Sequence, residues 1–246
     1  MLALKLHANV LQEFVEFSMD WLADRKYALA VDSDMSRWAQ TMSTAPSMAL
    51  INPTFDPRVN RLSPDNSFWL DIRAGSNTVA MIASRLFITD DYLELKRSLR
   101  LWYDVPRPED RPLRLTVAAD LQKICGNVGH EGGLWVHPEH RKQGLSVILP
   151  HLVRALAFRQ WDLDWHTGAA MRGVGASGLV SRAYGMPHVV PCYEGHFPIT
   201  GRPDRLYLAY MSRDELLAGL DLHRVAALLP DRHAQASDAI ALIKKG

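Results

Sequence analysis

The chain has 246 residues, which is enough to bury a substantial core, and its 48% apolar and 22% charged residues are typical of a globular protein. Its formal charge of +1 gives no field of one sign that would attract nucleic acid or anionic lipid. No apolar run approaches the roughly 18 residues of a membrane helix. Acidic residues arrive too early for a secretory signal, and two cysteines are too few for a disulfide framework. We therefore expect a cytoplasmic protein with no nucleic-acid or membrane partner.

The first 66 residues predict a helical extension that carries one strand. Apolar residues between Val10 and Leu22 recur at helical spacing. The apolar run from Tyr27 to Val31 predicts a strand, and residues 34–40 predict a second helix. Proline and asparagine residues between Pro46 and Pro64 indicate a loop.

A hairpin and an irregular segment follow. The runs 68–73 and 79–89 predict two strands, and the short connector between them contains glycine and asparagine, which favours a hairpin. Residues 90–103 predict a helix, which the proline- and charge-rich stretch 104–112 interrupts.

The remainder of the chain alternates strands and helices. In chain order we expect a strand at 132–137, a helix at 145–156, a strand at 164–170, a helix at 177–184, and strands at 189–193 and 206–210. Ser212 and Glu215 form a capping-box pattern that begins a helical tail over residues 212–246. This alternation predicts an α/β or α+β domain built around one mixed sheet.

The turn between the strand at 132–137 and the helix at 145–156 has the parts of a phosphate site. A helix N-terminus leaves its first amides unpaired and attracts anions. Gly144 permits close approach of a ligand, Arg141 and Lys142 add positive charge, and Ser146 can cap the first helical turn. On these residues alone, a simple tight turn with solvated basic side chains is an equal alternative.

The stretch Leu134–Ser146 resembles the acetyl-CoA motif of the GNAT superfamily of N-acetyltransferases, a strand ending in V-x-P followed by [RQ]-x-x-G-x-[GA]. Val136, Pro138, Arg141 and Gly144 match that pattern, and Ser146 replaces the usual small residue.

The resemblance implies a GNAT-like mixed, mostly antiparallel central sheet with flanking helices over residues 67–211. Compared with that pattern, the chain has an insertion near residues 90–131 and extra N-terminal and C-terminal helices in 1–66 and 212–246. These additions could form an acceptor lid or the interface of a homodimer. The motif strand should splay from the next strand and leave a gap for pantetheine.

The resemblance also implies acetyl-CoA as the acyl donor and an amine, on a small molecule or a protein, as the acceptor. The main chain at the helix start should hold the pyrophosphate, and the strand end should polarise the thioester carbonyl. The implied donor-binding residues are Trp135, Val136, Arg141, Lys142, Gln143, Gly144, Leu145 and Ser146.

Catalytic residues are harder to assign. Glu131, His130 and His137 flank the motif strand and are candidate bases, with a solvated loop role as the alternative. The family often has a tyrosine acid four residues before the glycine that ends the helix after the next strand. Ser181 occupies that position here, so the nearest tyrosine, Tyr184, is the candidate acid.

Two other patterns offer rival readings. Gly173–Gly178 matches G-x-G-x-x-G, which would suit an NAD(P)-dependent oxidoreductase, although no strand with a terminal acid follows at the usual distance. His137 and His140 are separated by a proline that blocks a helical ligand pair, so we expect no metal site. The sequence thus predicts a GNAT-like N-acyltransferase, with a catalytically silent acyl-CoA-binding module as the main alternative.

Overall fold

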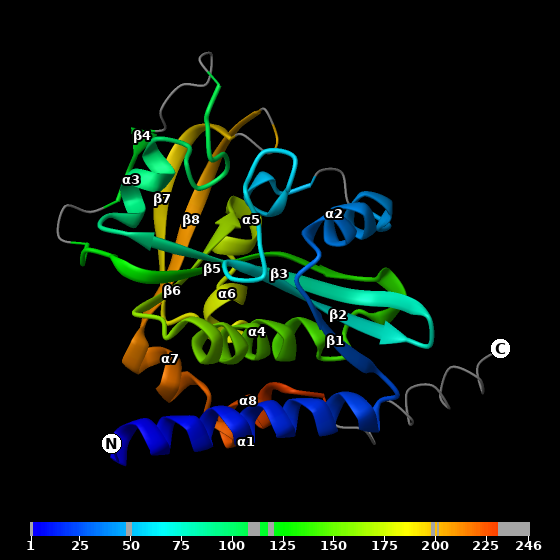
Figure 1. Ribbon diagram of the computed structural model, residues 1–246. Coiled ribbons are helices and arrows are strands. Elements are labelled where there is room, and N and C mark those ends of the chain that lie inside the picture. Colours follow the sequence, from blue (N-terminus) through cyan, green and yellow to red (C-terminus); the bar gives the residue numbers. More distant parts are fainter. Residues whose placement is uncertain are drawn as a thin grey trace.

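A single mixed sheet forms the centre of the molecule (Figure 1). The structure is a computed structural model that describes residues 2–47, 51–107, 114–117, 121–197, 200 and 202–230. Within these residues the sheet has eight strands in the order β1-β2-β3-β5-β6-β8-β7-β4. The strands are β1 (Ala28–Asp32), β2 (Ser67–Ala74), β3 (Asn77–Thr89), β4 (Arg114–Leu115), β5 (Gly126–Val136), β6 (Trp165–Met171), β7 (His188–Phe197) and β8 (Arg202–Ser212).

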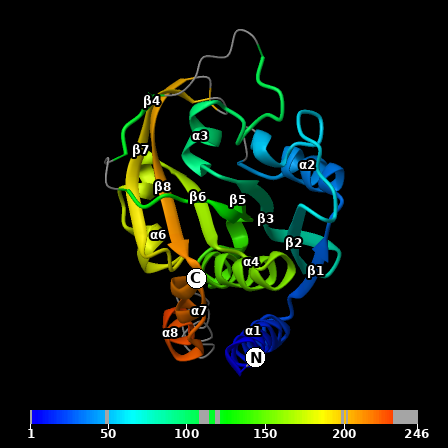
Figure 2. The same ribbon diagram turned by 60° about the vertical axis from the view of Figure 1, so that its left-hand side comes forward.

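Helices cover both faces of the sheet (Figures 1 and 2). On one face lies α4, and beneath it lie α1, α7 and α8; on the other face lie α2 and α3. The helices are α1 (Leu2–Asp24), α2 (Met35–Thr44), α3 (Tyr92–Arg97), α4 (Leu145–Trp161), α5 (Arg172–Gly175), α6 (Leu179–Arg182), α7 (Arg213–Gly219) and α8 (Leu222–Leu228), with single 3₁₀ turns η1 (Pro53–Phe55) and η2 (Pro138–His140).

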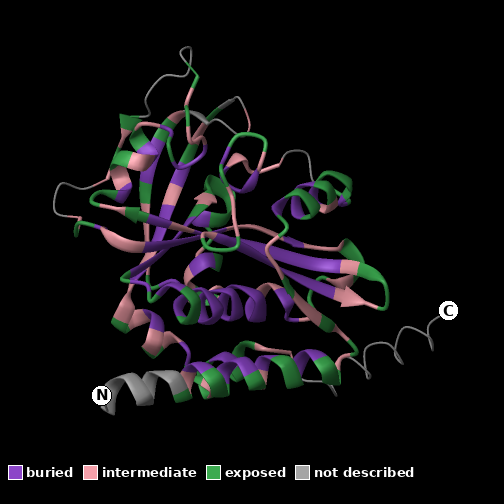
Figure 3. Ribbon diagram, in the orientation of Figure 1, coloured by how far each residue is buried: buried purple, intermediate pink, exposed green. Residues whose placement is uncertain are grey.

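The central position of α4 explains its composition. It packs on β3 and β5 with one side and on α1 with the other, so it is buried along most of its length (Figure 3). A helix that is enclosed on all sides is apolar on all sides and not amphipathic. Two charged or polar side chains in this helix, His151 and Arg154, are nevertheless buried.

The strand β5 pairs with β6 over only part of its length, and this opens the sheet. It pairs with β6 in parallel only from Val128 to Glu131, although both strands continue beyond that point. On its other side β5 bulges against β3: Ala83 lies opposite Gly132, and Met81 lies opposite Trp135. The bulge and the divergence from β6 therefore occur at the same place.

The predicted fold class is confirmed, since the sheet is mixed and all its neighbouring pairs except β5 and β6 are antiparallel. The hairpin of β2 and β3, the start of α4 and the Ser212–Glu215 capping box are also as predicted. The motif strand splays from the next one, as the resemblance implied.

Several boundaries differ from the predictions. The motif strand begins at Gly126 and not at residue 132, so the segment between β3 and the motif strand is residues 90–125 and not 90–131. The helix predicted at 90–103 ends at Arg97, and Leu99 follows with a φ of 66°, which a continuing helix cannot adopt. The helix predicted at 177–184 is shorter, because α6 covers only Leu179–Arg182, and the separate short helix α5 precedes it. The tail is helical to Leu228, and residues 231–246 lie outside the described residues.

Candidate active site

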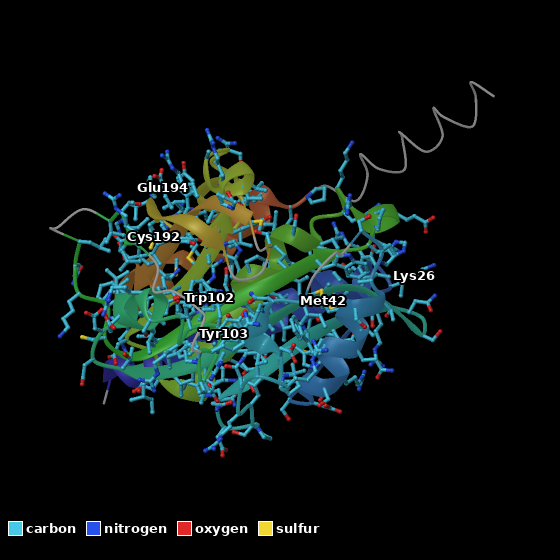
Figure 4. The ribbon with its side chains drawn as sticks, turned by 90° about the horizontal axis from the view of Figure 1, so that it is seen from above. Lys26, Met42, Trp102, Tyr103, Cys192 and Glu194 are labelled. Carbon is cyan, nitrogen blue, oxygen red and sulfur yellow. The ribbon has the colours of Figure 1, made fainter. Side chains whose placement is uncertain are left out.

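The opening between β5 and β6 contains a cavity of about 490 Å³ whose walls include residues from both faces of the sheet. On the α4 side its walls include Ile82, Val180 and Ala209, which belong to the main core. On the opposite side they include Asn52 and Met42, which projects from α2 and is labelled in the view from above (Figure 4). Two substrates could therefore meet in this cavity from opposite faces of the sheet.

Glu131 lies in the wall of this cavity and belongs to a buried cluster of polar groups. Its carboxylate oxygen Oε2 lies 3.0 Å from His166 Nε2 and 3.7 Å from Arg154 Nε. Burial lowers the pKa of His166, although the hydrogen bond that the imidazole donates to Glu131 opposes that shift. The imidazole is therefore neutral near pH 7, and its Nε2–H donates to the carboxylate, which can only accept.

Arg154 supplies the positive charge of this cluster. It is only 2% exposed, and its Nε donates to the carbonyl of Pro150 at 2.8 Å within α4. Its guanidinium also donates to the carbonyl of Tyr184. The side chain thus links α4 to Glu131 in the cavity wall and to Tyr184, which follows α6.

Tyr184 lines the same cavity, whereas Ser181, the position at which the family pattern expects the acid, is not among the lining residues. Burial raises the pKa of Tyr184, and the nearby charge of Glu131 raises it further. The phenol therefore keeps its proton through neutral pH, as a general acid must.

The N-terminus of α4 presents free main-chain donors. Gly144 is the N-cap, with a φ of 85°, and makes no side-chain cap; the expected capping by Ser146 is wrong, because Ser146 lies inside the helix. Among the residues that the structure describes, the amides of residues 142–146 have no hydrogen-bond acceptor. Arg141 and Lys142 are exposed beside them. This arrangement suits a bound diphosphate.

Residues from near both ends of the described chain pack against this turn. Gly144 is itself buried, and a Cβ added there would lie 2.9 Å from the Trp21 ring and 2.8 Å from Pro230. Arg25 fixes these two residues together: it stacks 4.0 Å above the Trp21 ring and donates to the Pro230 carbonyl at 2.9 Å. The requirement for glycine here is thus steric as well as conformational.

His137 does not join Glu131. In a regular strand residues six positions apart share a face, but the bulge adds one residue between them and turns His137 to the opposite face. It lines a separate pocket of about 420 Å³ together with Trp135. Trp135 itself is buried, and its indole nitrogen donates to the Pro46 carbonyl at 3.0 Å.

His130 is also outside the cavity wall. It is buried, and its Nδ1 lies 2.7 Å from the Tyr92 hydroxyl. Burial holds its pKa well below the usual value. It is therefore a neutral core histidine and lacks the access to substrate that a base requires.

The segment Gly173–Gly178 forms α5 and the residues leading into α6. Gly175 is buried against Tyr207, where an added Cβ would lie 2.5 Å from the ring. Gly178 has a φ of 73° and is the N-cap of α6. These two glycines thus have local packing and turn roles, and each of the two helices is only four residues long.

Arg154 and His166 did not emerge from the sequence as site residues. Arg154 could have been noticed, because it is a charged residue in the middle of the apolar run 145–158. No local pattern marks His166, since only the pairing of β5 with β6 brings it beside Glu131.

Two kinds of feature are absent from the part of the chain that the structure describes. No group of three or more histidine, cysteine, aspartate or glutamate side chains is placed there to hold a metal ion. None of the helices in this part of the chain is both long enough and apolar enough to cross a bilayer.

The chain is similar in structure to several acetyltransferases. It is 12% identical to NAA60 of Arabidopsis thaliana in complex with acetyl-CoA, over 76% of this chain and 99% of that chain, with a TM-score of 0.48. It is 9% identical to the ribosomal-protein-S18-alanine N-acetyltransferase from Escherichia coli, over 75% and 94% of the two chains, with a TM-score of 0.43. It is 10% identical to the dodecameric spermidine N-acetyltransferase from Vibrio cholerae, over 78% and 96%, with a TM-score of 0.43. No protein-family model and no curated protein sequence matches the chain. Its function is therefore inferred from its own residues.

Proposed function

We propose that the protein is an acyl-CoA-dependent N-acyltransferase that moves an acetyl or other short acyl group from CoA to a primary amine by direct attack. The observation that carries this proposal is the cavity between β5 and β6, which has Glu131 and Tyr184 in its walls. A carboxylate and a protonated phenol in one cavity are a suitable base and acid for amine acylation.

Two features of the chain fit the donor. The unpaired amides of residues 142–146, with Arg141 beside them, suit the diphosphate of CoA. Among the described residues, no strand pairs with β5 on its β6 side beyond Glu131, which leaves main-chain groups with which an extended pantetheine arm can pair. Acetyl-CoA would supply an activated thioester carbonyl at this position.

The roles of the side chains follow from their chemistry and their positions in the cavity wall. Glu131 takes the proton of the attacking amine, and Arg154 balances the charge of the carboxylate while His166 orients it. Tyr184 gives its proton to the departing thiolate. A main-chain amide at the bulge stabilises the negative charge on the carbonyl oxygen, which is typically worth about 3 kcal/mol.

The positions of the cysteines favour direct attack of the amine on the thioester over a route through an acyl-cysteine. A route through an acyl-cysteine would need a thiol in the cavity wall, and none of the described lining residues is a cysteine. Cys192 is buried in a different part of the core, with Trp102 and Leu208. We therefore expect sequential kinetics, in which donor and amine are bound together before transfer.

Calorimetry with acetyl-CoA and with NADH tests the donor first, because the second ligand represents the oxidoreductase alternative. We expect acetyl-CoA to bind and NADH not to bind. Arg141→Glu should weaken acetyl-CoA binding by about tenfold or more, because it reverses a charge beside the diphosphate. Binding of NADH in its place would overturn the proposal.

A thiol-release assay with a library of primary amines then tests transfer. Turnover of any amine would support an enzyme, whereas acetyl-CoA binding without turnover of the whole library would identify a silent binding module. Tyr184→Phe should reduce kcat by about 10²-fold or more with little change in acetyl-CoA affinity, because the phenol acts on the leaving group.

A further inference from the structure

The part of the cavity on the α2 side is apolar and uncharged. Its described walls include Met42, Met171 and Val174, together with the neutral polar residues Asn52 and Thr200. With acetyl-CoA approaching from the start of α4, this is the side from which the acceptor must enter. The acceptor therefore meets thioether, alkyl and amide groups rather than ions.

Only one carboxylate, Glu131, belongs to the described walls of the cavity. It already interacts with Arg154 and His166. Glu139, another carboxylate near a cavity, lines the separate pocket that also contains His137. No acidic group in these walls is left to neutralise a second positive charge on the acceptor.

The sequence around the cavity strengthens this observation. The described residues 42–47, 51–52, 132–136, 168–180 and 200, which include most of the lining residues, contain no aspartate or glutamate. They contain one charged residue, Arg172, which is positive and exposed. These residues therefore provide no negative charge that would attract a polycation to the cavity.

From this balance we infer that the acceptor is a small primary amine on an apolar and otherwise uncharged body, an alkylamine or arylalkylamine, and is not a polyamine or a basic peptide. This inference rests on the proposed acyl transfer. The attacking amine is deprotonated by Glu131, whereas a second amine would stay charged. Burying that charge among Met42, Met171 and Val174 would remove its hydration without providing a partner. An apolar body gains from the same burial.

Pentylamine and cadaverine test this inference, because they have the same chain length and differ only in the second ammonium group. With acetyl-CoA as the donor, we expect kcat/KM for pentylamine to exceed that for cadaverine by about tenfold or more, since the buried charge has no partner. Phenylethylamine should be used at least as well as pentylamine.

Two variants form a matched pair. Val174 and Leu179 are equally exposed, at 37%, but only Val174 lines the cavity. Val174→Asp should shift the ratio of the two kcat/KM values toward cadaverine by about tenfold or more, whereas Leu179→Asp should leave it unchanged.

Each outcome bears on the inference. If the native protein uses cadaverine as well as pentylamine, or if both variants shift the ratio equally, the proposed acceptor class is wrong while acyl transfer stands. If pentylamine and phenylethylamine are both inert but another amine is acylated, the class is likewise wrong. If no amine reacts and acetyl-CoA does not bind in calorimetry, the proposed function fails as well.

Discussion

Replacing Glu131 with Gln removes one negative charge from the centre of the molecule with almost no change in shape. The carboxylate accepts a hydrogen bond from His166 and lies 3.7 Å from Arg154 Nε. A glutamine oxygen can still accept from His166. However, the guanidinium, which is 2% exposed, would lose the carboxylate that balances its charge.

The size of the effect on stability follows from this geometry. Breaking a buried ion pair by removing one partner typically costs about 3–5 kcal/mol. Arg154 keeps the carbonyls of Pro150 and Tyr184 as acceptors, and its separation from the carboxylate is longer than a direct hydrogen bond. We therefore expect the free energy of unfolding to fall by about 3 kcal/mol, the lower end of that range. Loss of the base should lower kcat/KM by about 10²–10⁴-fold.

Urea unfolding and the thiol-release assay measure the two effects separately. The double variant Glu131→Gln/Arg154→Met removes the unbalanced charge, so it should be more stable than the single variant but equally inactive. If Glu131→Gln kept kcat/KM within about tenfold of the native value, Glu131 would not be the base. If the double variant were no more stable than the single one, the explanation through a buried charge would be wrong.

Three other changes test the structure around the site. Gly144→Ala should lower the free energy of unfolding, measured by urea unfolding, by about 2–5 kcal/mol, because the φ of 85° and the rings packed on this residue both oppose a side chain. Unchanged stability would contradict this packing. Gly173→Ala should leave both stability and acetyl-CoA affinity unchanged, because an added Cβ meets nothing within 4 Å, whereas a dinucleotide-binding loop would be damaged. Burial lowers the pKa of His130, His166 and His151, the last to about 3, so below about pH 6.5 the unfolded chain binds protons that the native protein does not. Stability should therefore fall on acidification by up to about 1.4 kcal/mol per pH unit for each histidine, and unfolding free energies that stay constant from neutral to mildly acid pH would refute this.

The fold was largely predictable because its signals are local. The glycine and asparagine connector of the β2–β3 hairpin, the Ser212–Glu215 capping box and the turn before α4 each depend on a few neighbouring residues. The start of β5 was missed because residues 126–131 contain two glycines and no alternating apolar pattern. Pairing with β3 along one side and β6 along the other holds that segment extended.

The site was predictable in part, for a similar reason. Glu131 and Tyr184 were proposed from their positions relative to the motif, and both line the cavity. Arg154 and His166 come from elements 23 and 35 residues further along the chain than Glu131, and only the packing of α4 and β6 brings them to it. His137 was proposed because it flanks the motif strand, but the bulge in β5, which no residue pattern had indicated, places it on the opposite face from Glu131. The cytoplasmic location and the homodimer stay predictions.

The support behind Gly144 has a consequence for the thermodynamics of donor binding. A glycine-containing turn that was free on all sides would sample many conformations, and that entropy would be lost when a ligand fixed it. Here Trp21 and Pro230 pack against the turn. This packing is expected to restrict the conformations of the turn before a ligand binds, so that the affinity for a diphosphate benefits from preorganisation.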